Sequence, residues 1–177
     1  GAEVILHGNN YDDASDYASW LAVERGLTII PPYDDPQVIA GQGTVGMEIL
    51  QQHKGALDAI FVPIGGGGLI AGIAVYVKSL SPETKIIGVE PEEAASMSKA
   101  LESGGPVTLE KVGIFADGAA VKRVGNLTFE IAEKYVDEVL CVSVDEICAS
   151  IKDIFEDTRS ITEPAGALSL AGLKQYV

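Results

Sequence analysis

Residues 58–78 read DAIFVPIGGGGLIAGIAVYVK, and this stretch decides the fold. The apolar, partly β-branched run 59–64 is typical of a strand that is buried on both faces. The run 69–80 is apolar almost all round, which predicts a buried helix. Between them, four glycines leave successive backbone N–H groups unshielded by any Cβ at the positive end of a helix dipole, an arrangement that binds anions. No lysine follows in the loop, so the stretch is not a Walker-type phosphate loop.

Composition limits the possible partners. The chain has 177 residues, of which 47% are hydrophobic and 21% charged, so it is globular rather than disordered. Its net charge of −14 argues against nucleic acid or an anionic membrane as a partner. No apolar run reaches the roughly 18 residues of a membrane helix, and no cleavable signal precedes the first predicted strand. Cys141 and Cys148 show no C-x-x-C spacing and are expected to be buried thiols in a reducing compartment.

Strands and helices are expected to alternate along the chain. Because the strands are continuous apolar runs, this order predicts an α/β fold with a mostly parallel sheet, helices on both faces and ligands at the carboxyl ends of the strands. A short helical turn is expected at Asp35-Pro36, and residues 103–125 are expected to be irregular. We predict strands at 3–7, 27–30, 59–64, 85–89 and 138–144, and helices at 12–25, 43–53, 69–80, 93–101, 127–135, from the capping box at Ser143 to about 159, and from Pro164 to the end.

The glycine loop taken alone allows three interpretations. In a dinucleotide fold, Gly66, Gly68 and Ala71 satisfy the G-x-G-x-x-G/A fingerprint, and Glu90 at the end of the next strand would bind a ribose hydroxyl. In the second interpretation, successive amides hold one phosphate, as in a pyridoxal phosphate (PLP) site. The third is a tight turn without a ligand, which four adjacent glycines make costly in unfolded-state entropy.

The rest of the sequence resembles one family over essentially its whole length. It is similar to the fold-type II PLP enzymes, and within them to threonine ammonia-lyase (threonine dehydratase, threonine deaminase) and its relative serine racemase. This resemblance implies a fold like that of the tryptophan synthase β subunit, present here as a partial catalytic domain. The segments that carry it are PPYDDPQVIAGQGT (31–44), VPIGGGGLIAG (62–72), IIGVEP (86–91), FADGAAVK (115–122), ICASIKDIFE (147–156) and TEPAGALSLAG (162–172).

The resemblance also implies roles for individual residues. Gly118 would let the backbone approach the cofactor ring, and Glu163 would lie near that ring, although an acid at a helix N-terminus also has a purely structural explanation. Glu90, with the carbonyl of Ala94, matches a structural cation site of some relatives; Ser96 stands there in place of an acid. The residues expected to cradle the PLP phosphate through their N–H groups are Gly65, Gly66, Gly67, Gly68 and Leu69.

No catalytic residue of the family is expected within this chain. The chemistry of the family needs a lysine that forms a Schiff base with PLP, in a Ser-x-Lys motif, and none of the nine lysines has that context. The chain is therefore expected to be inactive alone. Residues 1–30 would be the C-terminal part of a small domain, and residues 31–177 most of a large phosphate-binding domain.

The implied reaction is the conversion of L-threonine, or L-serine, to 2-oxobutanoate, or pyruvate, and ammonia, as a step of isoleucine biosynthesis. The alternatives are a serine racemase or related PLP enzyme and, from another class, a non-catalytic fragment that binds phosphate or PLP. The resemblance implies an amino-acid substrate, a homo-oligomeric full-length enzyme, and a cytoplasmic location, or an organellar one if a transit peptide precedes this segment.

Overall fold

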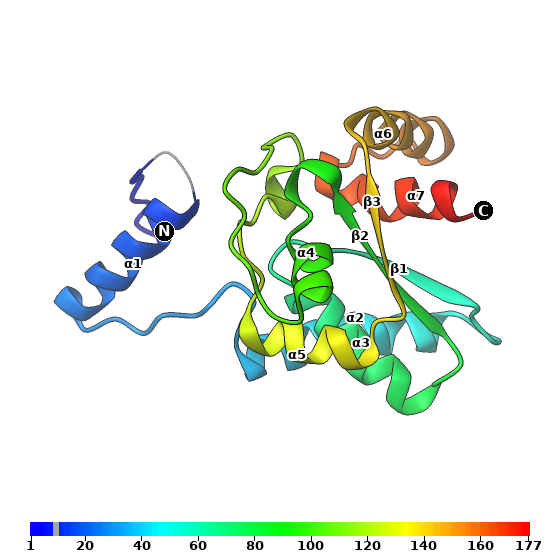
Figure 1. Ribbon diagram of the computed structural model, residues 1–177, viewed down its shortest axis with the longest axis horizontal. Helices are drawn as coiled ribbons and strands as arrows, with labels where there is room; N and C mark the ends of the chain where they lie inside the picture. Colours follow the sequence, from blue (N-terminus) through cyan, green and yellow to red (C-terminus); the bar gives the residue numbers. More distant parts are fainter. Residues whose placement is uncertain (9–10) are drawn as a thin grey trace. The chain divides into compact units, whose positions relative to one another are not determined.

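The computed structural model describes residues 1–8 and 11–177, except for the side chain of Asp12 (Figure 1). The described chain divides into two compact units, Gly1–Pro31 and Pro32–Val177. Each unit is described by itself below.

The first unit contains one described helix, α1 (Tyr11–Arg25). It ends where Gly26 takes a left-handed φ of 63°, as the sequence predicts. The strands expected at 3–7 and 27–30 do not form among the residues that the structure describes. An isolated strand leaves its backbone N–H and C=O groups without partners, and this unit offers no neighbouring strand to take them.

The second unit is built on a parallel sheet. Its described strands are β1 (Ala59–Pro63), β2 (Lys85–Pro91) and β3 (Glu138–Val142), in the order β1-β2-β3. The register pairs Pro63 of β1 with Val89, and Pro91 of β2 with Val142. The strands therefore end at the same edge of the sheet, which confirms the predicted parallel arrangement.

Helix α2 (Pro36–Gln52) unites two segments that the sequence analysis separates. Asp35 caps it by accepting hydrogen bonds from the N–H groups of Gln37 and Val38 at 2.8 and 3.1 Å. Gly43 does not interrupt the helix, because it lies at the crossing with the helix that follows β1. A Cβ at Gly43 would stand 3.2 Å from the carbonyl oxygen of Gly72. Gly43 is therefore a packing position and not a helix boundary.

The remaining helices follow the predicted order. The region expected as one helix at 93–101 is a 3-10 turn followed by α4, and the predicted capping box between Ser143 and Glu146 is present. The bounds are α3 (Gly68–Leu80), η1 (Glu92–Ala94), α4 (Ser96–Ser103), η2 (Asp117–Ala119), α5 (Asn126–Tyr135), α6 (Val144–Thr158) and α7 (Pro164–Tyr176).

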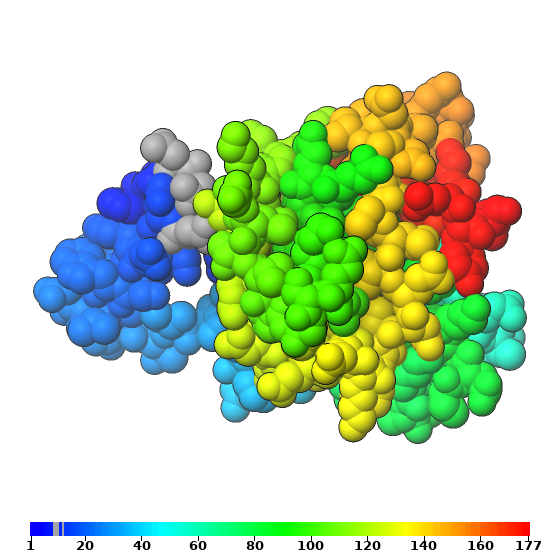
Figure 2. Space-filling view, in the orientation of Figure 1, coloured from blue at the N-terminus to red at the C-terminus, as the bar shows by residue number. Residues whose placement is uncertain are grey.

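Two hydrophobic cores lie on the two faces of the sheet. Ile60 and Val62 of β1 pack into the core beneath α3, α4 and α5, whereas Phe61 between them packs toward α6 and α7. This alternation follows from the two-residue period of a strand. Figure 1 shows α6 and α7 on one side of the sheet and α2, α3 and α5 on the other. In Figure 2 the side chains of α4, α5 and the loop between them cover the near face of this unit. The prediction of two buried cysteines is wrong: Cys141 is half-buried, and Cys148 on α6 is exposed.

The crossing of α2 and α3 gives a test of packing. A Cβ at Gly72 would lie 2.4 Å from the carbonyl oxygen of Ile39 and 2.5 Å from the amide nitrogen of Gly43. We expect Gly72→Ala to lower the free energy of unfolding by about 1–3 kcal/mol, because the two backbones must move apart. Urea denaturation followed by circular dichroism measures this change.

The control is Gly41→Ala in α2, where a Cβ would meet nothing within 4 Å. An alanine in an exposed helix interior should raise stability by about 0.5–1 kcal/mol. Equal effects of the two substitutions would contradict this account of the crossing.

Candidate functional site

The glycine loop connects the end of β1 to the start of α3. Ile64 still belongs to the sheet pattern, since its N–H donates to the carbonyl of Val89 at 2.9 Å. Gly67 then takes a φ of 94°, a left-handed conformation that side chains disfavour, and serves as the N-cap of α3 without a side-chain cap. Gly66, Gly67 and Gly68 are buried.

The N–H groups of this loop have no acceptor among the residues that the structure describes. From Gly65 to Ile70, none of them donates a hydrogen bond to any residue that the structure describes; Ala71 is the first to do so, to the carbonyl of Gly67 at 3.0 Å. Buried donors without partners are costly, and these lie at the positive end of the α3 dipole. The arrangement therefore favours a ligand with several negatively charged oxygen atoms.

The opposite side of the loop is held by the protein. The carbonyl oxygen of Gly66 accepts hydrogen bonds from the Thr128 hydroxyl at 2.7 Å and from the N–H of Gly125 at 3.3 Å. The ring of Tyr33 covers Gly66 so closely that a Cβ there would stand 2.2 Å from ring carbon atoms. A Cβ at Gly67 would meet Thr128 at 2.9 Å. Close packing therefore leaves no room for a side chain at Gly66 or Gly67.

The other residues expected around the cofactor lie beside this loop. A Cβ at Gly65 would be 3.3 Å from the carbonyl oxygen of Gly118, and a Cβ at Gly118 would be 2.9 Å from Oε1 of Glu163. Glu163 is exposed and is the N-cap residue of α7, but its side chain makes no cap hydrogen bond. Leu69 is half-buried and packs against the core beneath α3. The structure therefore brings Gly118 next to the glycine loop and Glu163 next to Gly118.

Sequence reasoning missed two residues that shape the loop. Tyr33 lies within a segment used for the family resemblance, but nothing in the sequence places its ring on Gly66. Thr128 lies in the first turn of α5 without any motif around it. Both contacts join segments that are far apart in the chain, so only the fold brings them to the loop.

Glu90 lies in a different environment from the glycine loop. It is fully buried at the end of β2, and its two carboxyl oxygens accept hydrogen bonds from the N–H groups of Met97 at 2.7 Å and Ser98 at 2.9 Å. Burial raises the pKa of Glu90 to about 7, and these N–H groups oppose the shift. A buried carboxyl held in this way is not available to a ribose hydroxyl, which removes the support for the dinucleotide interpretation.

The cation expected at Glu90 has few protein ligands. Ala94 and Ser96 are also buried, but the described residues contain no group of three or more His, Cys, Asp or Glu side chains that could hold a metal ion. The Ser96 hydroxyl oxygen is buried without a hydrogen-bond partner among the described residues.

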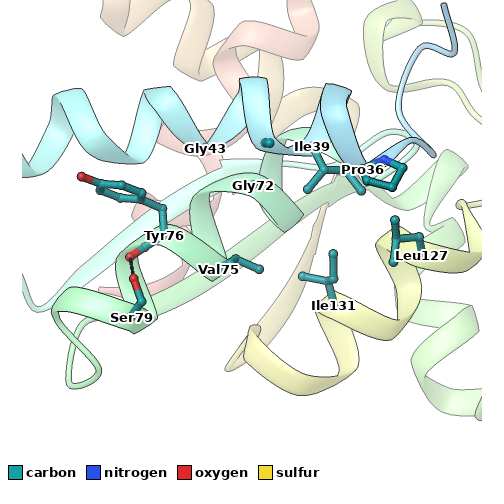
Figure 3. A pocket seen from close by; sticks show the side chains of 10 residues that line it. Pro36, Ile39, Gly43, Gly72, Val75, Tyr76, Ser79, Leu127 and Ile131 are labelled. Atoms are coloured by element: carbon teal, nitrogen blue, oxygen red, sulfur yellow. Dashed lines mark hydrogen bonds between the residues drawn. The ribbon is translucent and has the colours of Figure 1, made fainter.

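A separate cavity of about 520 Å³ lies along α3 beyond the glycine loop (Figure 3). Its polar side chains are Tyr76 and Ser79, and the Ser79 hydroxyl is bound to the carbonyl of Tyr76 at 2.7 Å. It has no charged side chain, so it does not suit an anion. Its lining residues come from α2, α3 and α5: Pro36, Ile39, Ala40, Gly43, Gly72, Val75, Tyr76, Ser79, Leu127 and Ile131.

No described helix is both long enough and apolar enough to span a membrane.

Comparison with known proteins identifies the relatives of this chain. It is 57% identical over 177 residues to the biosynthetic L-threonine dehydratase of Pasteurella multocida, covering all of this chain and 34% of that protein. It is 61% identical over 176 residues to the chloroplastic biosynthetic threonine dehydratase of Arabidopsis thaliana, covering 99% of this chain and 30% of that protein. The chain thus spans about a third of the length of these curated relatives.

Solved structures with the same fold agree with the sequence relatives. The processed threonine deaminase isoform 2 of Solanum lycopersicum superposes with a TM-score of 0.93 at 48% identity, over 97% of this chain and 50% of that one. Maize serine racemase superposes with a TM-score of 0.89 at 32% identity, over 94% of this chain and 52% of that one. The model of the family described as pyridoxal-phosphate dependent enzyme matches residues 1–177. The predicted resemblance is confirmed, and the chain belongs to the pyridoxal-phosphate dependent enzyme family.

Proposed function

We propose that this chain is the cofactor-phosphate-binding part of a threonine ammonia-lyase, which converts L-threonine to 2-oxobutanoate and ammonia. The observation that carries the proposal is the run of N–H groups from Gly65 to Ile70, which are unpaired among the described residues and lie at the N-terminus of α3. The names of the relatives, threonine dehydratase and threonine deaminase, support this choice of reaction.

The residues of the loop fit a phosphate monoester. The N–H groups of Gly65 to Leu69 have no acceptor among the described residues, and a Cβ on any of the four glycines would stand 2.2 to 3.2 Å from a neighbouring atom. PLP, when bound, supplies an electron sink for loss of the α-proton of an amino acid. The contribution of this chain is to bind and orient the cofactor through its phosphate, with backbone dipoles that the fold holds in place.

Gly118 and Glu163 would form the next part of the same site. A Cβ at Gly65 would stand 3.3 Å from the carbonyl oxygen of Gly118, and the carboxyl of Glu163 lies against the backbone of Gly118. We place Glu163 near the cofactor ring, where its carboxylate is favoured by the N-terminus of α7. The absence of a side chain at Gly118 would let the backbone pass close to the ring.

The residue that moves the α-proton is proposed to lie outside these 177 residues. None of the nine lysines stands in a Ser-x-Lys motif. Five of them already take part in hydrogen bonds or ion pairs at the surfaces of helices and strands: Lys78, Lys85, Lys99, Lys152 and Lys174. We therefore expect this chain to bind PLP without converting threonine.

The domain assignment and the biological setting belong to the same proposal. Residues 1–30 would be the end of a small domain and residues 31–177 most of the large domain, which the division of contacts at Pro31 supports. The full-length enzyme would act on an amino acid as a homo-oligomer. Its compartment would be the cytoplasm or an organelle, since relatives are named as chloroplastic and mitochondrial.

Serine racemase is the second candidate, supported by structural likeness at 32% identity. Conversion of L-threonine to 2-oxobutanoate by the full-length enzyme, without formation of D-serine from L-serine, supports the first candidate. The reverse result supports the second.

The affinity of the chain for the cofactor tests the phosphate site. We expect PLP to bind at least about tenfold more tightly than pyridoxal, because only PLP offers an anion to the loop amides. Equilibrium dialysis measures both affinities, and inorganic phosphate should compete with PLP but not with pyridoxal. Equal affinities for the two aldehydes would contradict the proposed site and favour a turn without a ligand.

We also propose a structural cation at Glu90 and Ala94. The alternative is that the buried Glu90 carboxyl takes up a proton instead, and the pH dependence of stability tests it. Since burial raises the pKa of Glu90 from 4.5 to about 7, the folded state binds this proton more tightly than the unfolded state. The stability that the protonated Glu90 carboxyl contributes is fully present below pH 4.5. It is lost as pH rises through 7, which lowers the free energy of unfolding by about 3 kcal/mol. Urea unfolding at pH 5 to 8 should show this decline in the wild type but not in Glu90→Gln.

Glu102→Gln removes an exposed carboxyl from α4 and controls for the change in net charge. A wild-type decline that persists in Glu90→Gln would contradict the assignment to Glu90. Stabilisation of the wild type by added Ca²⁺ or Mg²⁺ at pH 8, lost in Glu90→Gln, would instead support a cation at this position.

A further inference from the structure

Two adjacent residues that lie well before the glycine loop in the sequence contact both the loop and the first turn of α5, which binds the loop. Tyr33 and Asp34 lie just before α2, and we call them the Tyr33–Asp34 strap. We propose that this strap sets the affinity of the glycine loop for phosphate, with Asp34 as a positioning residue that acts through the N-terminus of α5. This inference rests on the proposed phosphate site.

Asp34 caps a helix that begins more than ninety residues later. Its Oδ2 accepts from the N–H of Asn126 at 3.0 Å, and its Oδ1 accepts from those of Leu127 at 2.9 Å and Thr128 at 3.3 Å. Gly125 is needed for this approach, because a Cβ there would stand 2.2 Å from Oδ1. The carboxylate therefore fixes the first turn of α5 against the segment that precedes α2.

The first turn of α5 in turn fixes one peptide of the glycine loop. Thr128 Oγ1 and the N–H of Gly125 both donate to the carbonyl oxygen of Gly66. In a trans peptide the C=O of Gly66 and the N–H of Gly67 point in opposite directions. Holding that carbonyl toward α5 therefore aims the Gly67 N–H away from α5, toward the side where the loop donors are free.

Tyr33 completes the support from the other end of the strap. Its ring covers Gly66, its backbone lies 3.0 Å from where a Cβ of Gly68 would be, and its hydroxyl donates to the carbonyl of Arg123 at 3.2 Å. The strap thus contacts the loop directly through Tyr33 and indirectly through Asp34.

The strap also decides which of two helix N-termini is open to an anion. Helices α3 and α5 both begin here, and each presents the positive end of its dipole. Asp34 occupies the N-terminus of α5 with its own carboxylate, whereas the N-cap of α3, Gly67, has no side chain. Phosphate is therefore directed to α3 and the glycine loop.

The test separates positioning from charge by the sign of the effect. Removing a nearby negative charge should by itself strengthen the binding of an anion. We expect Asp34→Ala to weaken PLP binding by about tenfold while pyridoxal binding is unchanged, because the Gly66 carbonyl is released. The measured quantity is the ratio of PLP to pyridoxal affinity by equilibrium dialysis, with inorganic phosphate followed by ³¹P NMR.

Asp35→Ala is the matched control. Asp35 is the neighbouring residue with the same charge, but it caps its own helix α2 by accepting hydrogen bonds from the N–H groups of Gln37 and Val38. This variant should lose stability and keep the wild-type affinity ratio. An Asp34→Ala ratio that equals that of Asp35→Ala overturns the inference.

A second pair of variants tests the route if Asp34→Ala does not fold. Thr128→Val removes the hydroxyl that binds the Gly66 carbonyl and should lower the PLP-to-pyridoxal ratio, whereas Thr128→Ser should restore it. An unchanged ratio in Thr128→Val overturns the inference and leaves the phosphate site standing. A wild-type chain that does not prefer PLP to pyridoxal overturns the proposed function itself.

Discussion

The glycine loop carries backbone donors that have no partner in the described part of the chain, and the surrounding packing is arranged around them. From Gly65 to Ile70 the chain leaves N–H groups unpaired among the described residues, at the point where β1 gives way to α3. Unpaired N–H groups of this kind are tolerated where a ligand accepts their hydrogen bonds. The four glycines are compatible with this arrangement because the faces of the loop opposite the donors are packed against protein.

The parallel sheet places this loop at its carboxyl edge, where α/β sheets generally bind ligands. All described strands end at the same edge of the sheet. The glycine loop follows β1 at this edge, Glu90 lies near the end of β2, and β3 leads into α6. The two carboxyl-end features have different tasks. The glycine loop offers donors to an anion, whereas Glu90 is already bonded to the N-terminus of α4. Proximity to the ligand-binding edge is therefore not enough to make a residue part of the site.

Much of the second unit was predictable because its signals are local. The strand–glycine–helix pattern of residues 58–78, the capping box at Ser143 and the proline at 164 each specify an element through neighbouring residues. The strands expected at 3–7 and 27–30 failed because an apolar run forms a strand only beside another strand. Gly43 of α2 was misread as a helix boundary because the reason for this glycine, close contact with Gly72, lies on another helix.

The α/β class, the family and the glycine loop can be predicted from the sequence, since each depends on residues that are adjacent or regularly spaced. The contacts that hold the loop become visible only in three dimensions. Asp34 reaches the N-terminus of α5, Tyr33 covers Gly66, and Thr128 binds the Gly66 carbonyl. Side chains that bind backbone groups of distant segments produce no regular pattern in the sequence. Their partners depend on how the whole chain folds.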